Sequence, residues 1–206
     1  MRYTGPKAKL CRREGYNLFG SEKYNTNTET KKKWRTPTLS EYGVQLRKKQ
    51  AAKRQFGLSE RQFHGYYHRA IRKEWVTGDA LLRMLEMRFD NVVFRANFSR
   101  TIMQSRQAVS HAHFLVNGKK VNIPSYQLQI GDVISLREKL KESALYKSLL
   151  EEFKAFASKN TSASLSQASW LSVNPKDLTI TVSALPEKKD FDSMIDIARI
   201  IEFYSK

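Results

Sequence analysis

The chain has 206 residues, a formal net charge of +17 at neutral pH, and 40% hydrophobic and 11% aromatic residues. This length and apolar content are enough for a buried core and argue against wholesale disorder. No apolar run approaches the roughly 20 residues that cross a bilayer, and the first residues contain no apolar signal core. We therefore expect a cytoplasmic protein and exclude a secreted or membrane-spanning one. Cys11 is the only cysteine, which excludes an internal disulfide and a cysteine-built zinc site.

The positive charge is concentrated in the first two thirds of the chain. Residues 1–80 contain 19 lysines and arginines against 7 acidic residues, and residues 81–140 contain 9 against 4. Residues 141–206 contain 9 of each and carry no net charge. A one-sided excess of this kind indicates a polyanionic partner, with nucleic acid as the first candidate and an anionic membrane surface as the second.

Residues 1–38 are predicted to be irregular, because glycine and proline punctuate them and a polar run precedes a cluster of lysines. Aromatic side chains among cations suit stacking on bases and pairing with phosphates. We therefore favour a segment that becomes ordered against a partner over a solvated tail. Its aromatic residues include Tyr3, Tyr16, Phe19, Tyr24 and Trp34.

Helical signals begin at Ser40, which can cap a helix running to about Gln55, with Gly57 suited to a left-handed C-terminal cap. The helix carries five cations with no acidic residue among them, and such charges repel one another in water. We therefore favour a phosphate-binding face over a solvated face. The five cations are Arg47, Lys48, Lys49, Lys53 and Arg54.

Further capping signals predict the next helices. Ser59 and Gln62 form a capping box for a helix running to about Trp75. Asp79 is expected to cap a third helix, and Thr101 with Gln104 opens a helix to about Ser110. Apolar spacing assigns these helices' core positions. They are Phe63, Tyr67, Ala70, Ile71 and Trp75 in the first helix, and Leu81, Leu82, Leu85 and Phe89 around the second.

Strand signals follow from residue 114. Asn117-Gly118 lies between Phe114-Leu115-Val116 and Lys119-Lys120-Val121, and this pair favours a type I′ hairpin turn. Three more strands are expected, and helical spacing resumes over 139–158 before a final apolar stretch at 195–204. The additional strands are Val133–Leu136, Trp170–Val173 and Leu178–Val182.

Signals of catalysis are sparse. The sequence contains no G-x-G-x-x-G, P-loop or G-x-S-x-G motif. His64 and His68 have the i, i+4 spacing of a two-histidine metal face, but no third ligand is convincingly supplied, so we favour surface or interface histidines. His111 and His113 flank the first hairpin strand, where RNA contact and structural packing are equally compatible.

The C-terminal acidic residues do not form a recognisable catalytic set either. Asp190, Asp192 and Asp196 lie in the neutral third of the chain, where capping of the last helix is the favoured role. No nucleophile, base and orienting group can be assembled. We interpret the chain as a binding protein, not an enzyme, with no metal and no cofactor.

Residues 88–93 (RFDNVV), 106–111 (RQAVSH) and 115–126 (LVNGKKVNIPSY) together resemble the RNA-binding module of the small-subunit ribosomal protein S-four family. The flanking sequences are also similar to that family, in the right order and over essentially the whole chain. They are residues 3–7 (YTGPK), 10–15 (LCRREG), 39–47 (LSEYGVQLR), 61–63 (RQF) and 201–206 (IEFYSK).

The resemblance implies an α+β fold: an N-terminal helical domain plus an RNA-binding module with helices and an antiparallel sheet of about five strands. The expected organisation is an irregular basic segment (1–38), a helical domain (39–89) completed by 187–206, and the module with its extended sheet (90–186). It also implies a structural constituent of the small subunit that binds a helix junction in the 5′ domain of ribosomal RNA early in assembly. Implied partners are that RNA, ribosomal protein S-five, with which it influences decoding accuracy, other small-subunit proteins, and messenger RNA at the entry channel.

The resemblance and the basic helix together give the expected RNA-binding residues. These are Arg2, Tyr3, Lys7, Arg12, Arg13, Arg47, Lys48, Lys49, Lys53, Arg54, Arg69, Arg88, Arg106, His111, Asn117, Lys119, Lys120, Ser125 and Tyr126.

Three departures from the family pattern qualify this expectation. Many members hold zinc with four N-terminal cysteines, whereas here Ala8 stands three residues before Cys11 and the second pair is absent, so we expect a zinc-free version. Ile102 replaces an arginine after the Thr that opens the module's second helix, which removes one phosphate contact. Residues 36–38 (TPT) interrupt the basic run associated with messenger contact. The alternatives are a stand-alone RNA-binding factor and an RNA-modifying enzyme anchored by the same module.

Overall fold

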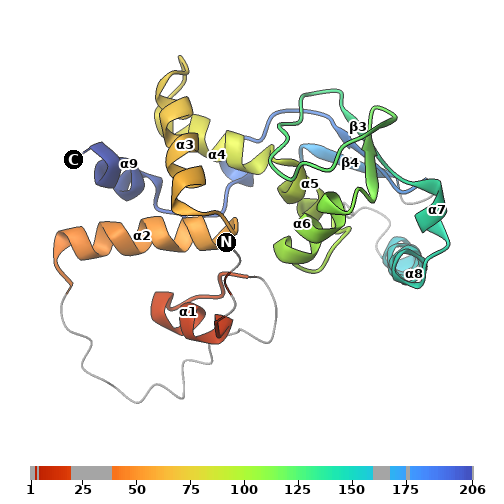
Figure 1. Ribbon diagram of the computed structural model, residues 1–206, viewed down its shortest axis with the longest axis horizontal. Helices are drawn as coiled ribbons and strands as arrows, with labels where there is room; N and C mark the ends of the chain where they lie inside the picture. Colours follow the sequence, from red (N-terminus) through yellow and green to blue (C-terminus); the bar gives the residue numbers. More distant parts are fainter. Residues whose placement is uncertain (1–2, 4, 20–38, 160–167, 175–176, 206) are drawn as a thin grey trace. The chain divides into compact units, whose positions relative to one another are not determined.

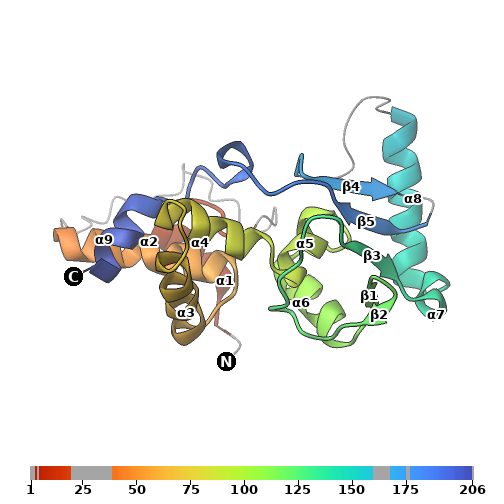
Figure 2. The same cartoon turned by 90° about the horizontal axis from the view of Figure 1, so that it is seen from above.

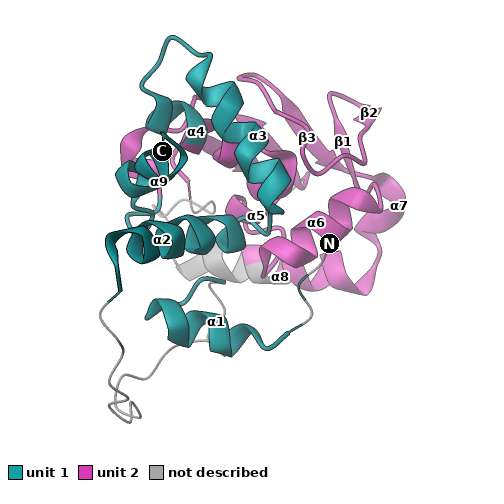
Figure 3. Cartoon of the chain, turned by 60° about the vertical axis from the view of Figure 1, so that its left-hand side comes forward, with its two compact units in different colours: residues 1–81, 192–206 teal, residues 82–191 magenta. Residues whose placement is uncertain are grey.

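The computed structural model describes residues 3, 5–19, 39–159, 168–174 and 177–205. Contacts divide the chain into two compact units, residues 1–81 with 192–206 (unit 1) and residues 82–191 (unit 2) (Figure 3). The domain boundaries expected from the sequence stay a prediction. Unit 1 contains α1 (Lys7–Glu14), α2 (Glu41–Gln55), α3 (Glu60–Ile71), the start of α4 (Thr77–Glu86) and α9 (Ile197–Ser205).

Helix α1 corrects the expectation that the N-terminal segment is irregular throughout. Leu10 and Cys11 on this helix are buried in one small core with Leu18, Phe19 and Ala51, the last of which belongs to α2. Burial against a distant helix therefore stabilises a segment whose local sequence gives little helical periodicity. The helix ends at Gly15, whose φ of +83° is the left-handed conformation that glycine adopts at low cost. Residues 20–38 lie outside the described residues.

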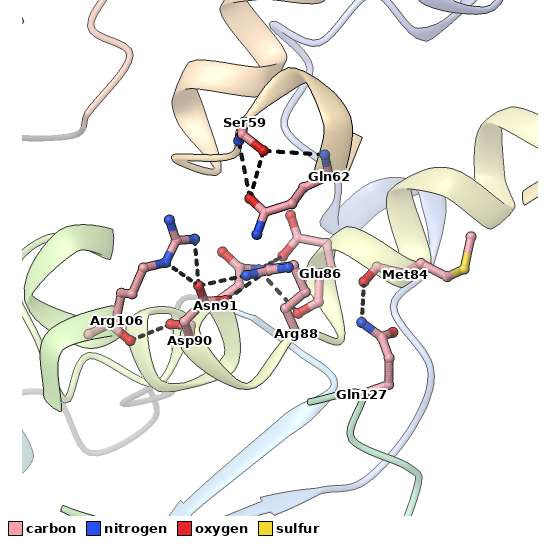
Figure 4. Close-up of polar contacts among 10 residues, drawn as sticks. Ser59, Gln62, Met84, Glu86, Arg88, Asp90, Asn91, Arg106 and Gln127 are labelled. Atoms are coloured by element: carbon pink, nitrogen blue, oxygen red, sulfur yellow. Dashed lines mark hydrogen bonds and ion pairs between the residues drawn. The ribbon is translucent and has the colours of Figure 1, made fainter. Parts of the chain in front are cut away.

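The capping signals at Ser40 and Ser59 are confirmed. The Ser40 hydroxyl accepts a hydrogen bond from the Gly43 amide at 3.3 Å, so α2 begins where expected. The Ser59 hydroxyl accepts from the Gln62 amide and the Gln62 side chain accepts from the Ser59 amide, which closes the capping box of α3 (Figure 4). Each cap satisfies an amide that has no partner within the helix.

The predicted extension of α3 to Trp75 is wrong, because the helix ends at Ile71. Ile71 and Trp75, which the spacing assigned to the core, are 50% and 47% exposed. The prediction that Asp79 caps the next helix is also wrong, because α4 begins at Thr77 and Asp79 lies within its first turn. The core assignments of the α4 region are confirmed, since Leu81, Leu82, Leu85 and Phe89 are all buried.

Unit 2 is built around a five-stranded antiparallel sheet with the strand order β2-β1-β3-β5-β4 (Figure 2). The type I′ hairpin is confirmed, with positive φ at both Asn117 and Gly118. The expected helix over 139–158 is instead two helices, interrupted at residues 142–143. The elements are α5 (Phe89–Arg95), α6 (Ile102–Ser110), β1 (Phe114–Val116), β2 (Lys119–Lys120), β3 (Val133–Leu136), α7 (Glu138–Lys141), α8 (Ala144–Lys159), β4 (Leu171–Asn174) and β5 (Thr179–Val182).

One face of this sheet forms the main core. Val116 pairs with Ile134, which pairs with Ile180, and all three are buried in a row across the sheet. Opposite residues of an antiparallel pair share a face, so this register places apolar side chains on the same side. Helices α5, α6 and α8 contribute to the same core, and Phe98, which lies between α5 and α6, contacts Phe153 of α8 at a ring-centroid distance of 5.6 Å. None of the helices in the described part of the chain is long and apolar enough to span a bilayer.

Candidate nucleic-acid interface

A buried carboxylate organises the start of the module in unit 2. Asp90 is fully buried and accepts hydrogen bonds from Arg88 Nε at 3.0 Å and Arg88 Nη2 at 2.9 Å. The same carboxylate accepts from Arg106 Nε at 2.7 Å and Arg106 Nη2 at 2.5 Å (Figure 4). Two guanidinium groups on one carboxylate leave a net charge of +1, and Arg106 on α6 is the member that reaches the surface, with a side chain 24% exposed.

The same network involves Arg88, which was expected to bind RNA directly. Its side chain is only 3% exposed and donates to Asp90 through Nε and Nη2, so this arrangement supports a positioning role and not a direct contact with RNA. A second buried acid, Glu86, accepts from Arg95 at 2.7 Å and from Asn91 at 2.6 Å. These bonds tie the end of α4 to α5 and fix the helix on which Asp90 lies.

The loop after the hairpin is attached to the same helix by its backbone. The Phe89 amide donates to the Tyr126 carbonyl at 2.9 Å, and the Asp90 amide donates to the Pro124 carbonyl at 3.2 Å. Ser125 and Tyr126 are exposed. Asp90 also holds Arg106, so Arg106 and the loop that carries Ser125 and Tyr126 are both attached to the start of α5. An arginine, a hydroxyl and an aromatic ring at one surface can contact a phosphate and stack on a base.

The hairpin presents two exposed lysines at an edge of the sheet. Lys119 and Lys120 form β2, which pairs only with β1. Asn117 serves the turn itself, because its Nδ2 donates to Asp132 at 2.8 Å and its Oδ1 accepts from the Val133 amide at 2.9 Å. Neighbouring side chains of a strand point to opposite faces, so the two lysines extend on different sides of the edge.

The histidines that flank β1 differ in environment. His111 is exposed, whereas His113 Nδ1 lies 2.9 Å from the Tyr146 hydroxyl. Burial, with the nearby charges of His111 and Arg137, lowers the pKa of His113. Burial raises the pKa of Tyr146 to about 12. His113 therefore packs as a neutral side chain, and His111 is the histidine available to a partner.

The interpretation of α2 as a set of unpaired cations is corrected by the structure. Lys49 Nζ lies 2.8 Å from one oxygen of Glu60, and Lys53 Nζ lies 3.1 Å from the other. Arg54 pairs with Glu14 of α1 at 3.1 Å. The acidic partners come from α3 and α1, so the sequence of α2 alone could not reveal them.

Lys49 is the clearest case, since it is buried and its Nζ lies 4.2 Å from the centroid of the Phe203 ring. Glu60 joins this cation to α9, because it also accepts a hydrogen bond from the Tyr204 hydroxyl at 2.7 Å. Burial by itself would raise the pKa of Glu60, but hydrogen bonds from Lys49, Tyr204 and Lys53 outweigh it and lower the pKa to about 2. Burial and the bond to Glu60 raise the pKa of Tyr204. This cluster attaches the C-terminal helix to α2 and α3.

The remaining expected residues of unit 1 lie mostly at the surface. Tyr3, Arg12, Arg13 and Arg69 are exposed. Lys7, Arg47 and Lys48 are partly exposed. Lys7 Nζ lies 5.5 Å from the Phe19 ring centroid, whereas Arg47 and Lys48 form no ion pair within the described part of the chain. Arg2 lies outside the described residues.

Sequence reasoning missed three residues that position others: Asp90, which holds Arg106 in unit 2, and Glu60 and Tyr204, which form the cluster around Lys49 in unit 1. The signal for Asp90 was its position in RFDNVV, two residues after Arg88, but its second ion pair is with Arg106 of the distant helix α6. Cys11 is a buried free thiol, and no group of three or more potential metal ligands occurs among the residues that the structure describes.

Comparison with known proteins gives two family matches on adjacent parts of the chain. Residues 2–86 match the family "Ribosomal protein S4/S9 N-terminal domain", and residues 87–134 match the "S4 domain". The small ribosomal subunit protein uS4 of Heliobacterium modesticaldum is 43% identical over 215 residues, covering 100% of this chain and 99% of that protein. The uS4A protein of Clostridium botulinum and the uS4 protein of Laribacter hongkongensis are each 42% identical with the same coverage. The chain belongs to the uS4 family of small-subunit ribosomal proteins.

Membership of the uS4 family confirms the expected resemblance and fold class, with helices in the N-terminal part and five antiparallel strands among the described residues. The S4-domain match begins at residue 87, immediately before Arg88 and Asp90. In this uS4 chain the match therefore covers α5, α6, the hairpin and the loop with Ser125 and Tyr126.

Proposed function

We propose that this chain is a non-catalytic component of the small ribosomal subunit that binds ribosomal RNA at a helix junction of the 5′ domain. In this role it helps to nucleate subunit assembly, contacts ribosomal protein S-five and other small-subunit proteins, influences decoding accuracy, and lies near messenger RNA at the entry channel. The observation that carries the proposal is the cationic surface of unit 2, in which Asp90 holds Arg106 and the start of α5 holds the loop with the exposed Ser125 and Tyr126.

The physical argument concerns preorganisation. RNA junctions are recognised by shape and phosphate position, so a binding surface gains from cations that are already fixed before binding. Arg106 is fixed by a buried carboxylate, and the backbone that carries the exposed Lys119 and Lys120 is fixed in a hairpin whose turn is closed by Asn117. We propose the exposed members of the expected set as direct contacts, with Arg88 and Lys49 as positioning residues.

The proposal is tested by titrating the full chain into a 5′-domain fragment of small-subunit ribosomal RNA at several salt concentrations. We expect the combined change Lys119→Glu and Lys120→Glu to weaken binding and to lower the salt slope by about 1 to 2, since each lost phosphate contact removes nearly one released counterion. The control is Lys188→Glu with Lys189→Glu, which alters charge equally at two exposed lysines elsewhere in unit 2. Equal effects of the two double variants would remove the hairpin from the site.

A further inference from the structure

The connection between α3 and α4 carries an exposed apolar surface that the proposed contacts do not use. Every residue from Ile71 to Val76 is exposed, the longest such run among the described residues. Ile71 is 50%, Trp75 47% and Val76 70% exposed. We call residues 71–76 the α3–α4 tip. It projects beyond the ends of both helices in Figure 1 and in Figure 3.

The tip exists because α3 stops early. Its core stripe runs through Phe63, Tyr67 and Ala70, and all three are buried. One more helical turn would have turned Trp75 toward the same side, but the helix ends at Ile71 and α4 begins at Thr77. A large aromatic side chain is thus held at the surface by a short turn between two packed helices, which restricts its freedom before any partner binds.

The charges around the tip select the kind of partner. Arg69, Arg72 and Lys73 are exposed within six residues of Trp75, whereas Glu74 is the only acidic residue from 61 to 78. The Arg69 guanidinium lies 4.3 Å from the centroid of the Tyr66 ring, so a cation of this region already packs on an aromatic ring. An apolar protein surface would not require these cations, while an anionic partner with flat aromatic groups would engage both features.

We propose that the α3–α4 tip binds RNA, with Trp75 stacking on an unpaired base and Arg72 and Lys73 contacting the adjacent phosphates. The proposal rests on the RNA-binding function proposed above and adds a second point of contact in unit 1. Stacking is tolerant of base identity because every base has an aromatic face, so the tip contributes affinity and position more than sequence specificity.

The first test compares Trp75→Ala, Trp75→Phe and Val76→Ser in titrations with the 5′-domain RNA fragment. We expect Trp75→Ala to weaken binding about tenfold to a hundredfold, the usual effect of losing one stacked base, with the salt slope unchanged because no charge is lost. Trp75→Phe should keep most of the affinity and Val76→Ser nearly all of it. Equal losses for Trp75→Ala and Val76→Ser would indicate general apolar burial and overturn the proposal.

The second test measures the solvent accessibility of Trp75 by quenching of its fluorescence. The chain has three tryptophans, of which Trp170 is buried, and Trp34→Phe removes the one outside the described residues. In that variant acrylamide should quench Trp75 in the free chain, and saturating RNA should protect it. Unchanged quenching in the complex would overturn the proposal.

The outcomes separate this inference from the proposed function. If the wild-type chain does not bind the RNA, the proposed function fails and this inference fails with it. If Lys119→Glu with Lys120→Glu weakens binding but Trp75→Ala binds normally, only the inference about the tip fails. Normal RNA binding by Trp75→Ala combined with its loss from assembled small subunits would assign the tip to a protein partner and refute the RNA contact.

Discussion

Replacing Asp90 with asparagine tests whether the buried network of unit 2 holds the proposed RNA surface. The substitution keeps the shape of the side chain but removes the negative charge that four N–H groups of Arg88 and Arg106 share at 2.5–3.0 Å. An asparagine also presents an NH₂ group to one of these donors, so at least one hydrogen bond becomes a donor–donor contact.

The magnitude follows from the burial of the two arginines. Removing one partner of a buried ion pair costs about 3–5 kcal/mol, because the other charge stays buried without compensation. Arg88 is 3% exposed and cannot reach water, whereas Arg106 is 24% exposed and can turn outward. We therefore expect the cost to lie near the lower end of that range, about 3 kcal/mol.

The assay is equilibrium unfolding in urea, followed by the fluorescence of Trp170, which is buried in unit 2. Replacing Trp34 and Trp75 with phenylalanine in every variant leaves this tryptophan as the only one. Asp132→Asn is the matched control, because Asp132 is partly exposed and accepts hydrogen bonds only from neutral groups, Asn117 and the Gln129 amide, in the described structure. A loss of about 1 kcal/mol is expected for the control. A loss for Asp90→Asn no larger than that of the control would refute the reasoning.

Three further predictions concern unit 1. Because the pKa of Glu60 is lowered in the folded state, ionised Glu60 stabilises the fold above about pH 4.5, and this stabilisation is lost as the pH falls toward 2. In thermal unfolding, the difference in stability between wild type and Glu60→Gln should therefore shrink to nearly zero between about pH 4.5 and about pH 2. At neutral pH this variant should cost about 1 kcal/mol, since solvent screens a side chain that is 44% exposed. Gly78→Val should lower stability by about 1–3 kcal/mol, because a Cβ at Gly78 would lie 3.0 Å from Ile197 and 3.2 Å from Ile201 of α9. Gly65→Ala, in open space on α3, should instead raise stability by about 0.5–1 kcal/mol; a destabilised Gly65→Ala would show that backbone freedom is not the limiting factor there.

Local signals in the sequence were enough to locate most elements. The capping box of Ser59 and Gln62 and the turn at Asn117-Gly118 act within four residues, so their structure is dictated by neighbours. The strand expected at Val133–Leu136 is β3, which has the same range in the structure. Fold class and family followed from these patterns and from the resemblance of the module.

Features that depend on distant partners could not be predicted in this way. Helix α1 is stabilised by packing against Ala51, and the cations of α2 are paired by Glu14 and Glu60, which lie up to 40 residues away. The early end of α3 exposes Trp75, although spacing alone continues its stripe. The burial of Arg88 likewise depends on the fold of unit 2, so a residue type suited to RNA contact was assigned a role that its position does not support.

The most direct test of the account is sedimentation of a cell extract on a sucrose gradient, with this chain quantified per particle after a high-salt wash. The account predicts one copy per small ribosomal subunit, retained in high salt because the contacts are many and the cationic surface is fixed before binding. Release into the soluble fraction, or a copy number well below one, would contradict a structural role and support a free RNA-binding factor.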